Sequence, residues 1–161
     1  MHKRGQAAME FLMTYGWAIL VVLVVIGALA YFGVLNPSIL LPERCEMQSG
    51  FNCKDYLVKG ASDELLMTIE NGRGSDFKVV SINLTSEQLG GASCTSDYSA
   101  NPIEIMNGRS QNFTMTCNPS IASYTGRNAK YKWDIVVKWF STDSSATYTH
   151  TLQGQLLARV E

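Results

Sequence analysis

The sequence predicts an α+β chain in which a long N-terminal apolar α-helix precedes an all-β, sandwich-like globular head. Three observations lead to this prediction. Only 17% of the 161 residues are charged, against about 25% in a typical soluble domain. The missing charge is concentrated, because no Asp, Glu, Lys, Arg or His lies between Glu10 and Glu43. Beyond that stretch, apolar and polar residues alternate with the period of two that is typical of strands.

The charge balance bears on the class of partner. The chain has 13 basic and 14 acidic residues and a formal net charge of −1. It therefore has no basic field that would attract a nucleic acid backbone. We expect no nucleic acid partner.

The first expected element is an apolar helix within residues 6–36. Residues 11–35 contain no charge and, at about 1.5 Å per residue, span roughly 37 Å as a helix, more than the ~30 Å core of a bilayer. Asn36-Pro37 marks the expected end, because the residue before a proline disfavours the α region. Lys3 and Arg4 precede the helix, which places the N-terminus in the cytoplasm and the head outside.

Four cysteines lie beyond the helix, and residues 37–63 are expected to form a linker and a disulfide loop. None of the four has the C-x₂-C spacing of a zinc site. Four cysteines allow three connectivities, and we favour the sequential one because each bond then closes one loop. The expected pairs are Cys45–Cys53 and Cys94–Cys117.

Two glycosylation sequons follow, which begin at Asn83 and Asn112, whereas the Asn-x-Ser triplet at Asn118 is blocked by its proline. Alternation places Asn112 opposite the apolar Phe113 and Asn83 opposite Leu84. Both acceptor asparagines are therefore expected on the outer surface of the head.

The head is expected at residues 64–161, with five or six strands. Residues 130–140 alternate most clearly, with an apolar face formed by Tyr131, Trp133, Ile135, Val137 and Trp139. Residues 147–160, with Tyr148 inward and a bulge at Gly154, are expected to pair with them as a hairpin. A second hairpin is expected from residues 65–69 and 80–84, with Val80 inward, around the turn at 71–74. Such short alternating strands favour a small β-sandwich.

The N-terminus carries the one specific motif. Residues 3–11 read Lys-Arg-Gly-Gln-Ala-Ala-Met-Glu-Phe, and here the chain resembles an archaeal type IV pilin precursor with a class III signal peptide. In that family a basic leader ends in glycine, a prepilin peptidase cuts after it, and mature chains begin Gln-x-Ser-x-Glu-Phe before a long apolar helix. The matching residues are Gly5, Gln6, Glu10 and Phe11, whereas Ala8 stands where serine is often found.

The resemblance implies roles for these residues. Residues 1–5 would be a cleaved leader, and the processing site would lie between Gly5 and Gln6. The positions recognised by the peptidase would be Lys3, Arg4, Gly5 and Glu10. The positions used in filament assembly would be Gln6, Glu10 and Phe11. The expected all-β head is similar to the heads of archaeal pilins and archaellins.

The resemblance further implies a structural subunit of a type IV pilus-like filament that serves cell adhesion. Its partners would be further copies of itself in a helical homopolymer, the prepilin peptidase, a pilus assembly ATPase with its membrane platform, and surface or cell ligands of the head. The precursor would lie in the cytoplasmic membrane as a transmembrane helix, and the mature glycoprotein in an extracellular filament. No cofactor is implied.

Two other fates of the apolar stretch remain as alternatives. Ala28-Leu29-Ala30 forms the A-x-A site of a secretory signal, although residues 11–27 exceed the usual apolar length of roughly 7–15 residues and Glu10 lies where a signal peptide is basic. A single-pass anchor that never polymerises is the second alternative. Both yield an extracellular β-domain that does not assemble.

Catalysis is not expected. His2 and His150 are the only histidines, and the sequence has no G-x-S-x-G, H-E-x-x-H or Walker motif. The acidic residues Asp63, Glu64 and Asp143 lack the spacing of an EF-hand, so no metal site is expected.

Overall fold

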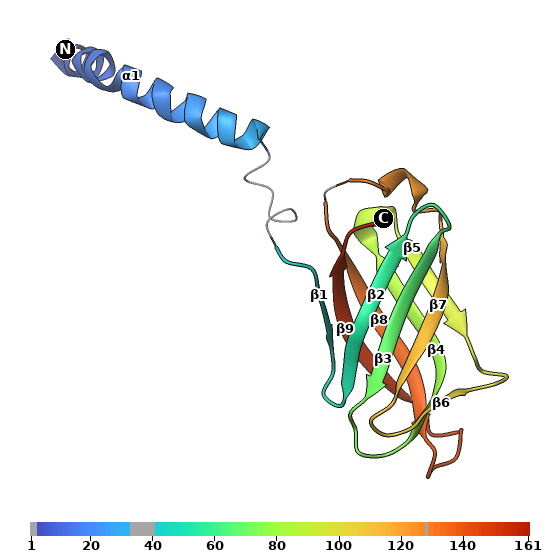
Figure 1. Ribbon diagram of the computed structural model, residues 1–161. Coiled ribbons are helices and arrows are strands. Elements are labelled where there is room, and N and C mark those ends of the chain that lie inside the picture. Colours follow the sequence, from blue (N-terminus) through green and yellow to red (C-terminus); the bar gives the residue numbers. More distant parts are fainter. Residues whose placement is uncertain (1–2, 33–40, 128) are drawn as a thin grey trace. The chain divides into compact units, whose positions relative to one another are not determined.

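The computed structural model describes residues 3–32, 41–127 and 129–161, and the chain divides into two compact units (Figure 1). Met1–Leu40 contains a long helix, and Leu41–Glu161 is the β head. The expected architecture of an apolar helix followed by an all-β head is confirmed.

Helix α1 (Lys3–Tyr31) begins before residue 6, inside the expected leader. The reason is composition, because Lys3, Arg4, Gln6 and Ala7 favour helix and only Gly5 opposes it. At the other end the helical pattern continues to Phe32, whose N–H donates to Ala28 O at 2.9 Å. The expected end at Asn36-Pro37 lies outside the described residues.

Nine strands and two short 3₁₀ helices make up the described part of the head, more than the five or six strands expected. The strands are β1 (Arg44–Met47), β2 (Phe51–Lys59), β3 (Glu64–Asn71), β4 (Phe77–Ser86), β5 (Ala92–Asp97), β6 (Ile103–Ile105), β7 (Ser110–Asn118), β8 (Tyr131–Ser141) and β9 (His150–Ala158). The 3₁₀ helices are η1 (Glu87–Leu89) and η2 (Ala122–Tyr124). Strands β1, β5 and β6 are too short or too poor in large apolar residues to stand out in the sequence.

All strand pairs in the head are antiparallel and belong to one sheet of order β1-β9-β8-β4-β5-β7-β3-β2, with β6 paired to β4. The sheet folds over on itself, so that β2, β3 and β7 form a layer facing β4, β8 and β9 (Figure 1). The result is a sandwich that is nearly a barrel.

The two end strands of this sheet, β1 and β2, meet at a seam. A disulfide joins Cys45 on β1 to Cys53 on β2. Farther along β2, the N–H of Glu161 donates to Val58 O at 2.8 Å and the N–H of Gly60 donates to Glu161 O at 2.7 Å. One covalent bond and two backbone hydrogen bonds therefore close the rolled sheet.

The interior between the layers is apolar. Its largest fully buried side chains include Trp133, Phe77, Phe113, Leu65, Met67 and Ile69. One polar side chain is fully buried at the end of β3, where Asn71 Nδ2 donates to Ser75 O at 2.9 Å and to Ile105 O at 2.8 Å. This amide ties the β3–β4 loop to β6, since a buried polar group requires partners.

The outer side of β4, β5 and β7 carries uncharged hydroxyl and amide side chains over most of their paired segments, up to Asp97 at the end of β5. We call this surface the hydroxyl face; its members are Asn83, Thr85, Ser93, Thr95, Asn112, Thr114, Thr116 and Asn118. The inward positions between them are buried and include Leu84, Cys94, Phe113, Met115 and Cys117. The expected exposure of Asn112 opposite Phe113 is confirmed, whereas Asn83 is half-buried.

The hairpin expected from residues 130–140 and 147–160 is confirmed as β8 and β9, whose register runs from Tyr131 opposite Ala158 to Trp139 opposite His150. The expected bulge at Gly154 is wrong, because that register is continuous. Gly154 instead allows the backbone of β1 to approach β9 closely, since a Cβ at this position would lie 2.6 Å from Glu46 O. Tyr148 is also not inward; it precedes β9 and is 69% exposed.

The second expected hairpin is wrong. Strands β3 and β4 do not pair; β3 lies between β2 and β7, and β4 lies between β8 and the strands β5 and β6. The turn at residues 71–74 therefore belongs to a loop that crosses between the layers. A register shift after Val79 also turns Val80 out of the core and buries Val79.

The expected linker at residues 37–63 is too long. Within it, β1 occupies residues 44–47 and β2 residues 51–59, and these strands pair with β9 and β3. The cause is the apolar side chains that these strands contribute to the interior, Phe51 and Val58 being buried.

Candidate functional site

The N-terminal motif lies in the first turns of α1. Lys3, Arg4, Gly5 and Gln6 all have helical backbone. Positions 6 and 10 are four residues apart and therefore lie one above the other on the same side of the helix. A cut between Gly5 and Gln6 would thus fall within a helical segment.

Glu10 is the acidic residue of α1, and its side chain is exposed. The hydroxyl of Thr14 donates to the backbone oxygen of Glu10 at 2.9 Å, a bond within one turn that leaves the carboxylate untouched. Phe11 packs its ring 4.9 Å from that of Tyr15, again one turn away. Glu10 therefore lies beside an aromatic pair at the start of the apolar stretch.

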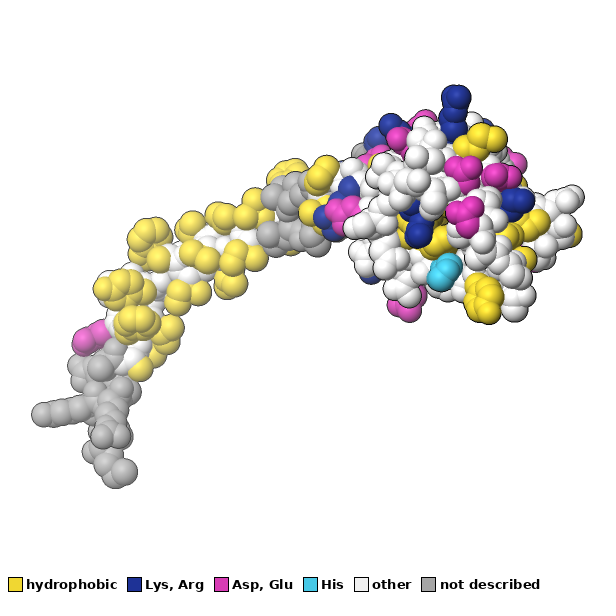
Figure 2. All heavy atoms as spheres, turned by 90° about the horizontal axis from the view of Figure 1, so that it is seen from below, with side chains coloured by type: hydrophobic (Ala, Val, Ile, Leu, Met, Phe, Trp, Pro, Cys, Tyr) yellow, Lys and Arg dark blue, Asp and Glu magenta, His cyan; other side chains and the backbone are white. Residues whose placement is uncertain are grey.

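The rest of the helix is apolar on every side. Large apolar side chains from Met9 to Tyr31 are between 39% and 87% exposed, and they cover the described helix along its length in Figure 2. In the described part of the head, by contrast, Leu41, Met106 and Tyr148 are the large apolar side chains exposed to this degree. By length and composition, Ala8–Tyr31 is sufficient to cross a membrane.

Two glycines lie on one side of this helix. Gly16 and Gly27 are eleven residues apart, which is close to three full turns. A Cβ placed at either would meet no atom within 4 Å. The backbone is therefore accessible at two heights on the same face, where another helix could approach closely.

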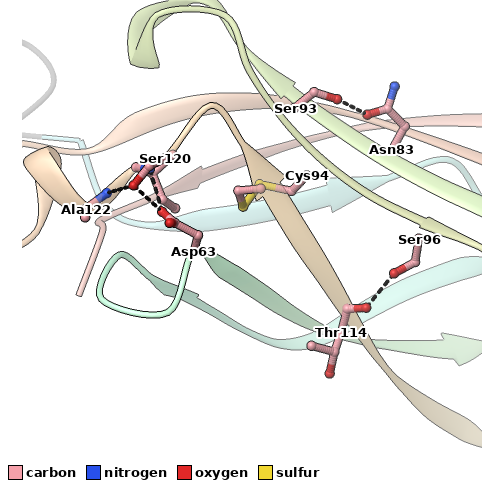
Figure 3. Close-up of a disulfide and its surroundings, with 10 residues drawn as sticks. Asp63, Asn83, Ser93, Cys94, Ser96, Thr114, Ser120 and Ala122 are labelled. Atoms are coloured by element: carbon pink, nitrogen blue, oxygen red, sulfur yellow. Dashed lines mark hydrogen bonds between the residues drawn. A yellow bond between two sulfur atoms is a disulfide. The ribbon is translucent and has the colours of Figure 1, made fainter.

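Both disulfides expected from the sequence are present in the head. Cys94 and Cys117 lie directly opposite each other in the β5–β7 ladder, and both are buried (Figure 3). Cys45 and Cys53 are half-buried at the seam. The four cysteines thus join strands rather than close free loops.

The side-chain oxygen of each sequon asparagine accepts a hydrogen bond from a neighbouring hydroxyl group. Asn83 Oδ1 accepts a hydrogen bond from Ser93 Oγ at 2.8 Å, and Figure 3 shows its amide nitrogen turned away from that bond. Asn112 Oδ1 accepts from Thr68 Oγ1 at 2.9 Å. Within the described residues, neither amide nitrogen donates a hydrogen bond.

The remaining titratable candidates have structural surroundings. His150 lies with its ring 4.7 Å from that of Trp139. Asp63 has a left-handed backbone, and its carboxylate accepts from Ser120 Oγ at 2.8 Å and from the Ile121 N–H at 2.7 Å. Asp143 is exposed. Among the residues described, no three His, Cys, Asp or Glu side chains are grouped so as to hold a metal ion.

Sequence reasoning missed the polar contacts made by the residues just before β1. Arg159 Nε donates to Glu43 Oε1 at 2.6 Å, and Lys130 Nζ donates to Leu41 O at 2.6 Å. Burial raises the pKa of the nearby Tyr56 phenol, and the carboxylates of Glu43 and Asp55 raise it further. These residues are far apart in the sequence, so that no local pattern could have indicated them.

One surface carboxylate is also perturbed. The N–H of Ser99 donates to Asp97 Oδ1 at 2.8 Å and, with the Ser99 hydroxyl, holds the pKa of Asp97 below its usual value. Lys138 lowers this pKa further. Asp97 is a local turn former, because its bond closes the first turn after β5.

No known protein-family model matches the chain, and no curated protein matches it either.

Proposed function

We propose that this chain is the structural subunit of an archaeal type IV pilus-like adhesion filament and that it polymerises through its N-terminal helix. The alternative is a secreted or single-pass membrane-anchored extracellular β-domain that does not polymerise. The observation that carries the proposal is a long helix with apolar side chains exposed on every side, in a chain whose head has a buried core of its own.

The free energy of that exposure decides the environment of the helix. Burying one Val, Leu, Ile, Phe or Met side chain contributes about 1.5–3 kcal/mol. More than a dozen such side chains are exposed on α1, so that leaving them in water would cost tens of kcal/mol, more than the roughly 5–15 kcal/mol that stabilises a whole domain. The helix therefore needs lipid, a packed assembly, or each in turn.

Glu10 favours an assembly over a plain anchor. An acidic residue within a bilayer costs about 2.5–3.5 kcal/mol on insertion scales, so that its presence at the start of an apolar helix calls for a partner. Cleavage after Gly5 would remove Lys3 and Arg4 and create an α-ammonium at Gln6. This ammonium and the Glu10 carboxylate would form a pair of opposite charges.

The ammonium of Gln6 and the carboxylate of Glu10 can pair in two ways. Within one chain the groups lie one helical turn apart, which suits an i,i+4 contact. Between chains, the ammonium of one subunit meets the carboxylate of the next and fixes their register. We favour the second geometry, because a buried ion pair is best attested as a device for register.

The helical backbone around Gly5 is compatible with processing. A peptidase needs an accessible, unwound peptide bond, and glycine destabilises a helix interior by roughly 0.5–1 kcal/mol relative to alanine. Local unwinding at Gly5 is correspondingly less costly there than at its neighbours. The prepilin peptidase, the assembly ATPase and its membrane platform are the partners that this route requires.

The N-terminus of the exported protein tests the proposal. Sequencing or intact mass gives a start at Gln6 for a processed pilin, at Tyr31 for a secreted domain and at Met1 for an anchor. Electron microscopy of the sheared surface fraction, with peptide mapping of the filaments, then decides polymerisation. A start at Tyr31 or Met1, or a surface fraction without filaments that contain this chain, would overturn it.

A further inference from the structure

A shallow hollow on the outer surface of the head lies beside one of the two sequons. It has a volume of about 190 Å³, and outward side chains of β2, β3 and β7 line it. These side chains form two rows across the three strands. One row is Asp55, Thr68 and Asn112, and the other is Leu57, Leu66 and Thr114.

The two rows differ in chemistry. Leu57 and Leu66 are half-buried apolar side chains on an outer surface that is otherwise mostly polar. Asp55 and Thr68 provide polar atoms at the edge of the same hollow. An apolar floor with polar atoms at its rim suits a sugar ring, which has apolar C–H faces and hydroxyl groups around its edge.

The acceptor amide at this hollow is positioned for modification. Thr68 Oγ1 donates to Asn112 Oδ1, which engages the oxygen of the amide and not its nitrogen. An N-linked sugar is attached through Nδ2 and leaves Oδ1 as a carbonyl acceptor. The Thr68 bond is therefore compatible with the modified side chain.

We propose that Asn112 carries an N-linked glycan whose first sugar ring lies in this hollow on Leu57 and Leu66. The hollow is smaller than the roughly 300–1,000 Å³ of pockets for drug-sized ligands, so that it takes one ring and leaves the rest of the glycan in solvent. Asn83 differs, because it is half-buried between β5 and β8, and no lining residue of this hollow belongs to its sequon.

The covalent step requires a sugar linked to a lipid phosphate and a membrane transferase as co-reactants. Asn112 Nδ2 forms a bond to the anomeric carbon of the sugar and loses one proton to a base of the transferase. The bond between that carbon and the phosphate oxygen breaks, and its electron pair leaves with the lipid phosphate.

The inference rests on the export of the head in the proposed function, but not on polymerisation. A membrane-anchored or secreted form would carry the same sugar. Loss of filaments and loss of the glycan are therefore separate outcomes, read from electron micrographs and from peptide masses respectively.

Peptide mass spectrometry of the full chain purified from its own cells tests the modification. We expect the peptide that contains Asn112 to carry a hexose or N-acetylhexosamine series. Asn112→Gln and Thr114→Ala should abolish it, whereas Thr114→Ser and the matched control Asn83→Gln should retain it. An unmodified Asn112 in the exported wild-type chain overturns the proposal.

Thermal unfolding tests the position of the sugar. Leu57→Ala should lower the melting temperature more in the glycosylated chain than in the Asn112→Gln background, because only the first loses a contact between leucine and sugar. Equal decreases in the two backgrounds would show that the sugar does not lie on Leu57. They would overturn this part of the proposal and leave the attachment site intact.

Discussion

Cys45 and Cys53 covalently join the two end strands of the rolled sheet. Edge strands expose unpaired backbone groups and invite association with other chains. In this head the disulfide holds β1 and β2 together, and the Glu161 hydrogen bonds close the same seam at the other end of β2. These bonds therefore hold together two edges that would otherwise be open.

Replacing Cys45 and Cys53 with alanine should destabilise the head by about 2.5 kcal/mol, the chain-entropy value for a short loop, whose cysteines are 8 residues apart. Denaturant unfolding without reductant measures the loss. Hydrogen exchange should accelerate first in β1. The matched control is the Cys94→Ala, Cys117→Ala pair, which opens a separation of 23 residues and should cost about 3.5 kcal/mol. Unchanged exchange in β1 would contradict the role of the seam bond.

Asn71→Ala should destabilise the head by about 3 kcal/mol, because it leaves the backbone oxygens of the half-buried Ser75 and the buried Ile105 without their donor. Chemical denaturation measures the change. Asn107→Ala is the control, since Asn107 is exposed and its side chain accepts one bond from the Gly74 N–H. A loss as large in the control as in Asn71→Ala would show that burial is not the cause.

Gly154→Ala should displace β1 from β9, because the new Cβ would approach Glu46 O to 2.6 Å and Met47 Cα to 3.2 Å. Overpacking of this kind costs typically about 1–3 kcal/mol. The melting temperature measures it, with the exposed Gln153→Ala as control. A melting temperature equal to that of the wild type would mean that β1 adjusts freely.

The stability of the head should decrease in alkali through Tyr56. Its pKa is raised in the folded state, so that the folded head binds this proton more tightly than the unfolded chain. The contribution is complete below the unfolded pKa of about 10 and is lost as the pH rises through the folded value. Tyr56→Phe should make the decrease in stability above about pH 10 less steep, as measured by denaturant midpoints. An identical decrease of stability in alkali for the wild type and for Tyr56→Phe would show that a different group causes it.

Glu10→Ala should leave the chain processed and exported but should impair filament formation, because the carboxylate that pairs with the new N-terminus is lost. N-terminal sequencing should still give Gln6, and electron microscopy should show few or no filaments. Thr14→Ala, one turn farther along the helix, is the control and should assemble. Normal filaments from Glu10→Ala would refute the ion pair as the determinant of register.

The sequence allowed the elements with strong periodicity to be predicted. The charge-free helix, the alternation around Trp133 and the face that buries Phe113 could each be read from a local pattern, and all three are present. The pairing of Cys94 with Cys117 was also predicted correctly, as part of the sequential connectivity in which each bond closes one loop.

Local sequence patterns could not predict which strands pair with each other. The alternation predicts that Leu65 and Leu84 face the core, but it does not indicate which strands lie beside their own. The β3–β4 connection was therefore mistaken for a hairpin, whereas Asn71 anchors a loop between layers. The hollow beside Asn112 could not be predicted for the same reason, since Leu57, Leu66 and Thr114 come from three separate segments. The N-terminal motif is different, because its proposed roles depend on other molecules.

The hydroxyl face of β4, β5 and β7 has a physical consequence. Its eight side chains include no group that titrates, whereas carboxylates lie at its border: Asp97 ends β5 opposite Ser81, and Asp134 of β8 lies opposite Thr85. Dissolved salt therefore screens fixed charges at the border of this surface and has none to screen among the eight side chains themselves. Neighbouring heads that approach through this surface would act on one another by charge through its border, and more weakly in brine than in fresh water.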